Sequence, residues 1–223
     1  MERHLDDELK KLNTDLVKMA SLAEEAIFKS VEALKNQDKE LAQTVIDGDG
    51  KIDEMENSIE EEAINLLATK QPMAVDLRFI TTGMKINTEI ERIADLAVNI
   101  AQRVIEVSDE PLVKPLVDIP KLSEVARKMV KQAIDSFVNK NEFMAKQVIL
   151  SDPEANALKN SITDELIDEH ISKNSNISLR AVPLILVARH LERICDHATN
   201  IAEDVIYMVR AKVVKHRKIE NGD

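Results

Sequence analysis

Apolar residues recur every three to four positions along most of the chain, and breaks in this pattern divide it into six segments. This spacing predicts amphipathic helices, because residues three and four apart share one face of a helix. The expected helices cover residues 5–34, 38–69, 74–107, 120–139, 142–172 and 177–215. Long helices joined by short loops pack as antiparallel bundles, so the pattern predicts an all-α fold of six long helices.

Prolines mark the best boundary within the chain. Pro111, Pro115 and Pro120 cluster between the third and fourth predicted helices. Because proline ends helices and stiffens linkers, we expect a first unit over residues 1–110 and a second over 111–223.

An internal repeat supports this division. Residues 91–102 read ERIADLAVNIAQ and residues 192–203 read ERICDHATNIAE, with eight of twelve positions identical at an offset of 101. Weaker matches extend the repeat backwards, pairing residues 76–78 with 178–180 and residues 49–55 with 152–158. Duplication of one helical unit explains these matches. The chain is therefore predicted to form two tandem, pseudo-symmetric three-helix bundles, placed end to end or side by side.

Composition narrows the function. The net charge of −11 argues against nucleic-acid binding, which needs a basic surface. The locally basic stretch from Lys212 to Lys218 is interpreted as a solvated helix end. A single cysteine, Cys195, allows no internal disulfide and favours a reducing compartment. With no signal-peptide pattern and no apolar run of membrane-spanning length, we expect a cytoplasmic protein without direct membrane insertion.

Acidic residues repeat at helical spacing in both halves. One turn apart on a helix, they form rows of oxygen atoms on one face. The rows are Glu91, Asp95 and Asn99 in the third helix, Glu192, Asp196 and Asn200 in the sixth, and Asp49, Asp53, Glu56 and Glu60 in the second. Like charges one turn apart repel, so a bound cation would explain them better than solvent alone. Facing rows would suit hard cations that prefer oxygen ligands.

Other interpretations remain open. Such rows are also common on solvated helix faces near the surface, and Arg92 and Arg193 could pair with them. Copy one has Ala94 where copy two has Cys195, so the cysteine is expected to serve packing; His197 could be a ligand only in the second half. The chain lacks Glu-x-x-His and His-Glu-x-x-His motifs, phosphate loops and nucleophile elbows. We therefore expect no enzymatic activity; a carboxylate-bridged, hydrolase-like metalloenzyme and a purely structural helical scaffold are the alternatives.

The motifs resemble those of the PhoU family of phosphate-signalling regulators. The resemblance covers essentially the whole chain, and its carrying segments are residues 49–56 (DGKIDEME), 71–78 (QPMAVDLR), 91–101 (ERIADLAVNIA) and 191–203 (LERICDHATNIAE). It implies two three-helix bundles and a homodimeric cytoplasmic partner of the phosphate ABC transporter, through its ATPase subunit, and of the phosphate-sensing histidine kinase. It further implies negative regulation of phosphate uptake and of the starvation response.

The resemblance also implies a metal site in each bundle. The implied ligands are Asp49, Asp53, Glu91 and Asp95 in the first bundle and Asp152, Glu192 and Asp196 in the second, with Asn99, Asn156 and Asn200 as neighbours of the ligands. The cofactor would be divalent or trivalent metal ions, including multinuclear iron, with Fe, Zn, Mn, Mg, Ca and Ni as candidates. Asn156 stands where copy one has Asp53, so the second site is expected to bind more weakly, carry less charge or be empty.

Overall fold

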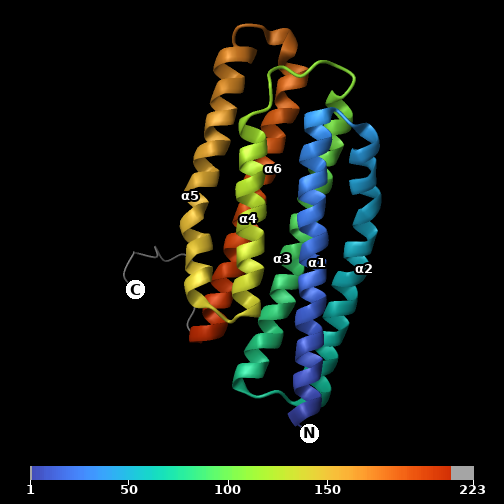
Figure 1. Ribbon diagram of the computed structural model, residues 1–223, viewed down its shortest axis with the longest axis vertical. Helices are drawn as coiled ribbons and strands as arrows, with labels where there is room; N and C mark the ends of the chain where they lie inside the picture. Colours follow the sequence, from blue (N-terminus) through green and yellow to red (C-terminus); the bar gives the residue numbers. More distant parts are fainter. Residues whose placement is uncertain (1, 212–223) are drawn as a thin grey trace.

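The structure, a computed structural model, describes residues 2–211, with side chains from Leu5 onward. Six α-helices follow one another along the described chain (Figure 1). They are α1 (Glu2–Asn36), α2 (Lys39–Lys70), α3 (Ala74–Val107), α4 (Asp118–Val138), α5 (Glu142–Asp164) and α6 (Ser178–Arg210). The predicted all-α class is confirmed, and no strand occurs between residues 2 and 211.

Two helix ends differ from the prediction. The fifth predicted helix is α5 followed by a π-helical segment, η1 (Glu165–Ile171), and a short 3₁₀ turn, η2 (Ser175–Ile177), then leads into α6. The sixth helix ends at Arg210, because Ala211 adopts a left-handed conformation with φ of 55° and its N–H bonds the carbonyl of Tyr207. The basic stretch predicted at Lys212–Lys218 lies outside the described residues.

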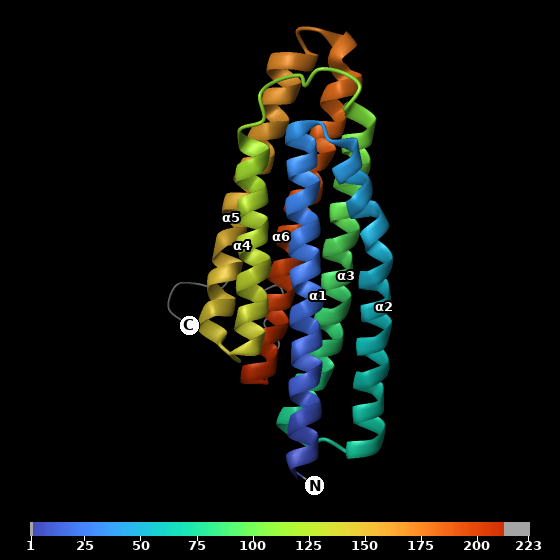
Figure 2. The same cartoon turned by 45° about the vertical axis from the view of Figure 1, so that its right-hand side comes forward.

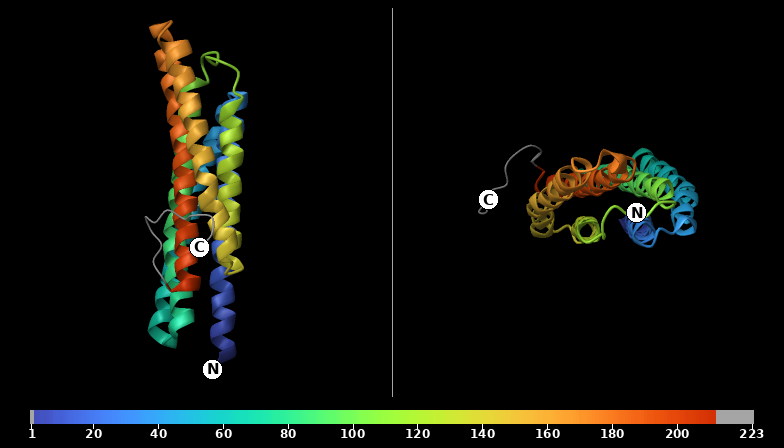
Figure 3. Two further views of the ribbon diagram at one scale, coloured as in Figure 1. Left: turned by 90° about the vertical axis from the view of Figure 1, so that its left-hand side faces the viewer. Right: turned by 90° about the horizontal axis from the view of Figure 1, so that it is seen from above.

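The two three-helix units lie side by side. Helices α1–α3 form the first half and α4–α6 the second, and all helix axes run along the long dimension of the molecule (Figures 1 and 2). Viewed from the end, α2, α3, α6 and α5 make a curved layer, with α1 and α4 on its inner side (Figure 3). The halves meet where α3 packs on α6 and α1 packs on α4.

The duplication is visible in local structure. Asp38 and Asn141 cap α2 and α5, and each side chain accepts the backbone N–H three residues later, at 2.8 and 3.2 Å. The residues before them, Gln37 and Lys140, both adopt left-handed conformations, with φ of 52° and 49°. In both halves, therefore, the first helix ends and the second begins in the same way. The Asx side chain satisfies a backbone N–H that would otherwise be free at the helix start.

Two matching arginines, Arg78 of α3 and Arg180 of α6, each donate to a backbone carbonyl outside their own helix. Arg78, near the start of α3, donates from Nε to the carbonyl of Met208 at the end of α6, at 3.2 Å. Arg180, near the start of α6, donates from Nη1 to the carbonyl of Pro111 after α3, at 3.0 Å. Met208 is among the last four residues of α6, whose carbonyls lack a partner within the helix, and Pro111 lies between α3 and α4, outside any helix.

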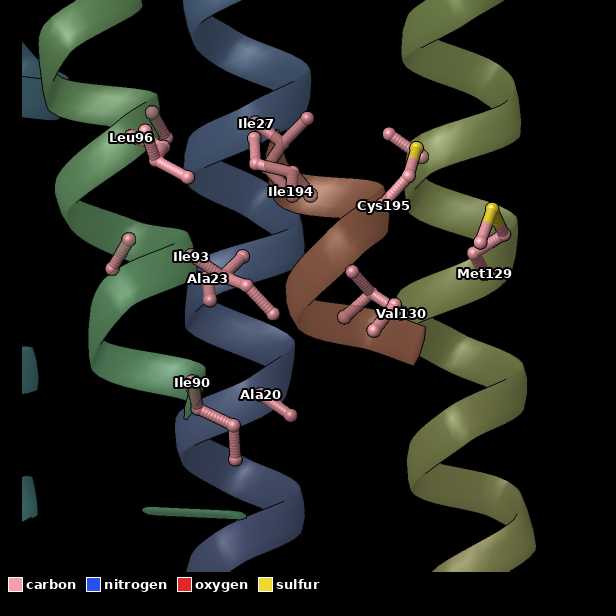
Figure 4. Close-up of a cluster of buried hydrophobic side chains, with 14 of the residues drawn as sticks. Ala20, Ala23, Ile27, Ile90, Ile93, Leu96, Met129, Val130, Ile194 and Cys195 are labelled. Atoms are coloured by element: carbon pink, nitrogen blue, oxygen red, sulfur yellow. The ribbon is translucent and has the colours of Figure 1, made fainter. Parts of the chain in front are cut away.

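The apolar core is continuous across the junction. Ile90 and Ile93 of α3 point toward α1, and Ile194 and Cys195 of α6 lie between α1 and α4 in the same cluster (Figure 4). Phe79 of α3 stacks on Phe137 of α4 with ring centroids 4.9 Å apart. Neither half therefore encloses a separate core. Within residues 2–211, no helix combines the length and hydrophobicity that crossing a membrane requires.

Candidate metal sites

The first acidic row is formed by neighbouring faces of α2 and α3. Asp49, Asp53 and Glu56 lie on α2, and Glu91 and Asp95 lie on α3, which packs against it. The helix spacing of three and four residues places each set along one face. The pKa of Asp49 is raised, first by burial and then by the charges of Asp53 and Asp95. The two helices therefore bring these five carboxylates within electrostatic reach of one another.

Glu91 is the most perturbed member of this row. Its pKa rises from 4.5 to about 7, first because of burial and then because of Asp95, with Arg92 opposing and Glu56 adding to the rise. The side chain is only 15% exposed. Oε2 is buried and accepts no hydrogen bond, although the Arg92 Nε lies 3.3 Å away as an ion pair. This carboxylate has lost much of its hydration without gaining a full set of partners.

The exposure of the row only partly follows the sequence expectation. Asp95 lies near the surface with 43% of its side chain exposed, whereas Glu91 is largely covered because α2 packs beside it. Arg92 does contact both acids, reaching Asp95 Oδ2 at 3.4 Å, but its own side chain is 57% exposed. Solvent screens such a pair, so Arg92 compensates the row only weakly.

The second row lies on α5 and α6. Asp152 has a raised pKa because of burial, and one of its carboxylate oxygens, Oδ2, accepts a hydrogen bond from Asn156 at 3.0 Å. Its other oxygen, Oδ1, is buried and has no hydrogen-bond partner. The pKa of Asp196 is also raised, first by burial and then by Glu192 and Asp152. Each half thus places a buried carboxylate oxygen without a hydrogen bond in its acidic row.

Three predicted neighbours take different positions. The Asn156 amide contacts the row through Asp152, and the Asn99 amide donates to the carbonyl of Asp95 in its own helix, at 2.9 Å. The Asn200 amide instead donates to Glu89 Oε2 of the first half, at 3.2 Å. His197, the other candidate in the second half, reaches that same oxygen through Nδ1 at 2.6 Å. Asn200 and His197 therefore engage the junction between α3 and α6.

Cys195 packs in the hydrophobic core, as expected. Its side chain is fully buried in the cluster that also holds Met129 and Val130 (Figure 4). Burial, reinforced by nearby carboxylates, raises the pKa of the thiol well above its ordinary value. A neutral thiol is a poor metal ligand, because the thiolate is the form that binds metals. The donors available in both rows are therefore oxygen atoms.

The side chains do not form a closed coordination site. Among the residues that the structure describes, no three His, Cys, Asp or Glu side chains converge closely enough to hold a metal ion. The helices supply the facing rows, and side-chain rotation would have to close them around a cation. The oxygen donors and the two buried oxygens without hydrogen bonds fit a hard cation.

Glu56 belongs to the first row but was not among the predicted ligands. Its pKa is raised by burial first, then by Glu60, Asp53 and Asp95, and it contributes in turn to the pKa of Glu91. Its helical spacing from Asp53 was the available signal. The sequence could not show that Glu56 is partly buried and lies near Asp95 of α3, and these two features distinguish it from a solvated glutamate.

Comparisons with known proteins agree with this architecture. A family profile described as "PhoU domain" matches residues 16–104 and 119–205. The chain is 42% identical over 217 residues to the "Phosphate-specific transport system accessory protein PhoU homolog" of Aquifex aeolicus, covering 97% of this chain and 98% of that protein. The crystal structure of PhoU from Pseudomonas aeruginosa superimposes with a TM-score of 0.88 at 34% identity, covering 93% of this chain and 99% of that one.

A second solved structure shares the fold at lower identity. The phosphate transport system regulatory protein PhoU from Streptococcus pneumoniae gives a TM-score of 0.87 at 24% identity, covering 94% of this chain and 99% of that chain. The domain profile matches once in each half, in agreement with the repeated helices and caps. With two profile matches that together span most of its length, and a full-length relative well above 30% identity, the chain belongs to the PhoU family.

Proposed function

We propose that this protein is a metal-binding regulator of phosphate homeostasis. It restrains phosphate uptake and the starvation response by contacting the ATPase subunit of the phosphate ABC transporter and the phosphate-sensing histidine kinase. The relatives' names, accessory proteins of the phosphate-specific transport system, support the association with phosphate transport. The proposal includes a cytoplasmic homodimer that acts through docking and has no catalytic activity of its own.

The metal part of the proposal rests on the paired acidic rows. In each row a buried carboxylate oxygen, one on Glu91 and one on Asp152, accepts no hydrogen bond. Leaving such an oxygen buried without a hydrogen bond costs about 1–3 kcal/mol, or more for a charged group, which a bound cation would offset. The residues that would hold the metal are Asp49, Asp53, Glu91 and Asp95 in the first half and Asp152, Glu192 and Asp196 in the second. Iron is one candidate among several oxygen-preferring ions.

The metal ions would serve charge compensation. When bound, they supply positive charge that lets α2 pack on α3, and α5 on α6, with their carboxylates ionised. The chain's own contribution is to hold the carboxylates of α2 opposite those of α3, and those of α5 opposite those of α6, on rigid helices. A surface fixed in this way would offer one defined shape to the transporter and the kinase.

Metal analysis of protein purified without chelators tests this part. We expect stoichiometric metal in the wild type and a loss in the double variant Asp95→Ala with Asp196→Ala. The matched control is Asp7→Ala with Asp109→Ala, since both aspartates are highly exposed and lie outside the rows. If the wild type holds no stoichiometric metal under any divalent supply, the metal part of the proposal is wrong.

A deletion strain tests the regulatory part independently. Loss of the gene should raise phosphate uptake and expression of starvation genes when phosphate is plentiful. Complementation with the wild type should restore repression, and complementation with the row variants should restore it less. Normal phosphate regulation in the deletion strain would remove the regulatory proposal even if the protein binds metal.

A further inference from the structure

The two acidic rows differ at a position directly after the matched segments 49–55 and 152–158. Residues 49–56 of α2 correspond to residues 152–159 of α5 at a constant shift of 103 positions. The final pair of this alignment is Glu56 and Lys159. The chain therefore carries a lysine in the second half at the place of an acidic residue in the first.

The structure places both residues where the second helix of a half contacts the third. Glu56 lies against α3, where Asn87 donates to its backbone carbonyl at 2.8 Å, and its carboxylate contributes to the raised pKa of Glu91. Lys159 faces α6, where its Nζ lies 3.8 Å from Oε1 of Glu192, the residue that corresponds to Glu91. Both side chains of this pair are largely covered, with 27% of Lys159 and 16% of Glu192 exposed. The ammonium group thus lies at the acidic row and not on an open helix face.

The charge of the two rows differs accordingly. The first row has the carboxylates of Asp49, Asp53, Glu56, Glu91 and Asp95. The second row has the carboxylates of Asp152, Glu192 and Asp196, the neutral amide of Asn156, and the ammonium of Lys159. Its formal charge is therefore −2, against −5 for the first row's carboxylates, or −4 when the exposed Arg92 beside them is counted. A partly buried ammonium at this distance attracts its carboxylate more strongly than an exposed one would, because solvent screens it less.

We propose that Lys159 is the built-in counter-cation of the second row. It supplies a largely covered positive charge from within the chain, whereas the first row has only the exposed Arg92, which solvent screens, and takes the rest of its compensation from a bound divalent cation. The second half is consequently stabilised without metal and binds divalent ions less tightly, while the first half depends on them. This inference rests on the proposed metal-binding function and assigns its dependence on metal to the first half.

Manganese binding to the second half alone tests the proposal. In a Glu91→Gln, Asp95→Asn background, which disables the first row, Mn²⁺ affinity is measured by calorimetry with and without Lys159→Glu. Restoring the acidic residue should tighten binding at least tenfold, which corresponds to about 1.4 kcal/mol. Lys159→Gln removes the charge without adding an acid and should tighten binding by a smaller factor. Lys128→Glu, at an exposed lysine of α4 in the same half, is the charge-matched control and should change affinity less than about twofold.

Thermal unfolding in EDTA provides a readout without metal. Lys159→Glu should lower the unfolding midpoint more than Lys128→Glu does, and Mn²⁺ should then restore it. Lys159→Gln should lower the midpoint modestly, since Glu192 loses its partner. If Lys159→Glu does not fold, the Mn²⁺ affinity and the unfolding midpoint of Lys159→Gln test the counter-cation role instead.

The outcomes separate this inference from the proposed function. Unchanged second-row affinity and an unchanged midpoint in both Lys159 variants would overturn the counter-cation role, even with the wild-type first row binding Mn²⁺ normally. Absence of Mn²⁺ binding in the wild-type protein would instead overturn the metal-binding function. In that case a lower EDTA midpoint in Lys159→Gln than in Lys128→Gln would still support Lys159 as a counter-cation, and equal midpoints would reject it.

Discussion

Replacing Glu91 with glutamine should stabilise the metal-free protein at alkaline pH. Burial and neighbouring carboxylates raise the pKa of Glu91 to about 7 in the folded protein, against an ordinary value of 4.5. Between these two values the folded state binds more protons than the unfolded state. The free energy of unfolding therefore falls as pH rises from about 4.5 through about 7, and it stays low above that range. Glutamine keeps the size of the side chain and carries no charge to desolvate.

The size of the effect follows from the same shift. The full difference between the two pKa values corresponds to about 3 kcal/mol. Solvent reaches part of the row and screens it, so we expect about 1–2 kcal/mol at pH 8. For a chain of this length that equals roughly 2–8 °C in the unfolding midpoint. At pH 5 the advantage of Glu91→Gln should shrink to about a quarter, because the folded wild-type carboxyl is then mostly protonated.

The assay is urea or thermal unfolding of wild type and Glu91→Gln in EDTA at pH 5 and pH 8. Glu192→Gln is the matched control, because the same substitution in the second half removes an attraction to Lys159 at 3.8 Å and should bring no gain. Adding Mn²⁺ at pH 8 should stabilise the wild type more than Glu91→Gln, since a ligand that binds only the native state raises stability. The reasoning is refuted if the gap between wild type and Glu91→Gln does not grow from pH 5 to pH 8.

Three further outcomes test the junction between the halves. Gly83→Ala should stabilise by about 0.5–1 kcal/mol in urea unfolding, because alanine favours helix and its Cβ would lie 3.4 Å from Leu16 Cδ1. Gly83→Leu, which cannot fit there, should destabilise. Phe137→Ala should cost about 3–5 kcal/mol in the same assay, because it removes a buried ring that stacks on Phe79, and should keep a single transition, because the remaining core is continuous across both halves. Separate transitions would show independent halves. Cys195 should resist iodoacetamide in the native protein and react after unfolding, as measured by mass spectrometry, because the buried thiol has a raised pKa.

The sequence by itself determined the helices and their duplication. Helical periodicity and proline positions predicted all six helices, because amphipathic spacing is a local property that the chain carries without its neighbours. The end of α6 was missed, since nothing in the side chain of Ala211 announces a left-handed cap. The recurrence of Glu91 and Asp95 as Glu192 and Asp196 likewise identified the acidic rows, because residue spacing alone fixes which side chains share a helix face.

Only the tertiary structure decided how these rows are compensated. Burial depends on what packs beside a helix, so the covering of Glu91 by α2 and its raised pKa could not be derived from α3 alone. The same holds for Asn200 and His197, which turn to Glu89 because α6 lies against α3. The contact between Lys159 and Glu192 likewise required the packing of α5 against α6, which the sequence of either helix alone does not give. The spacing of the acidic residues is encoded locally, but the burial of each carboxylate and the charged side chains that lie beside it depend on contacts between helices.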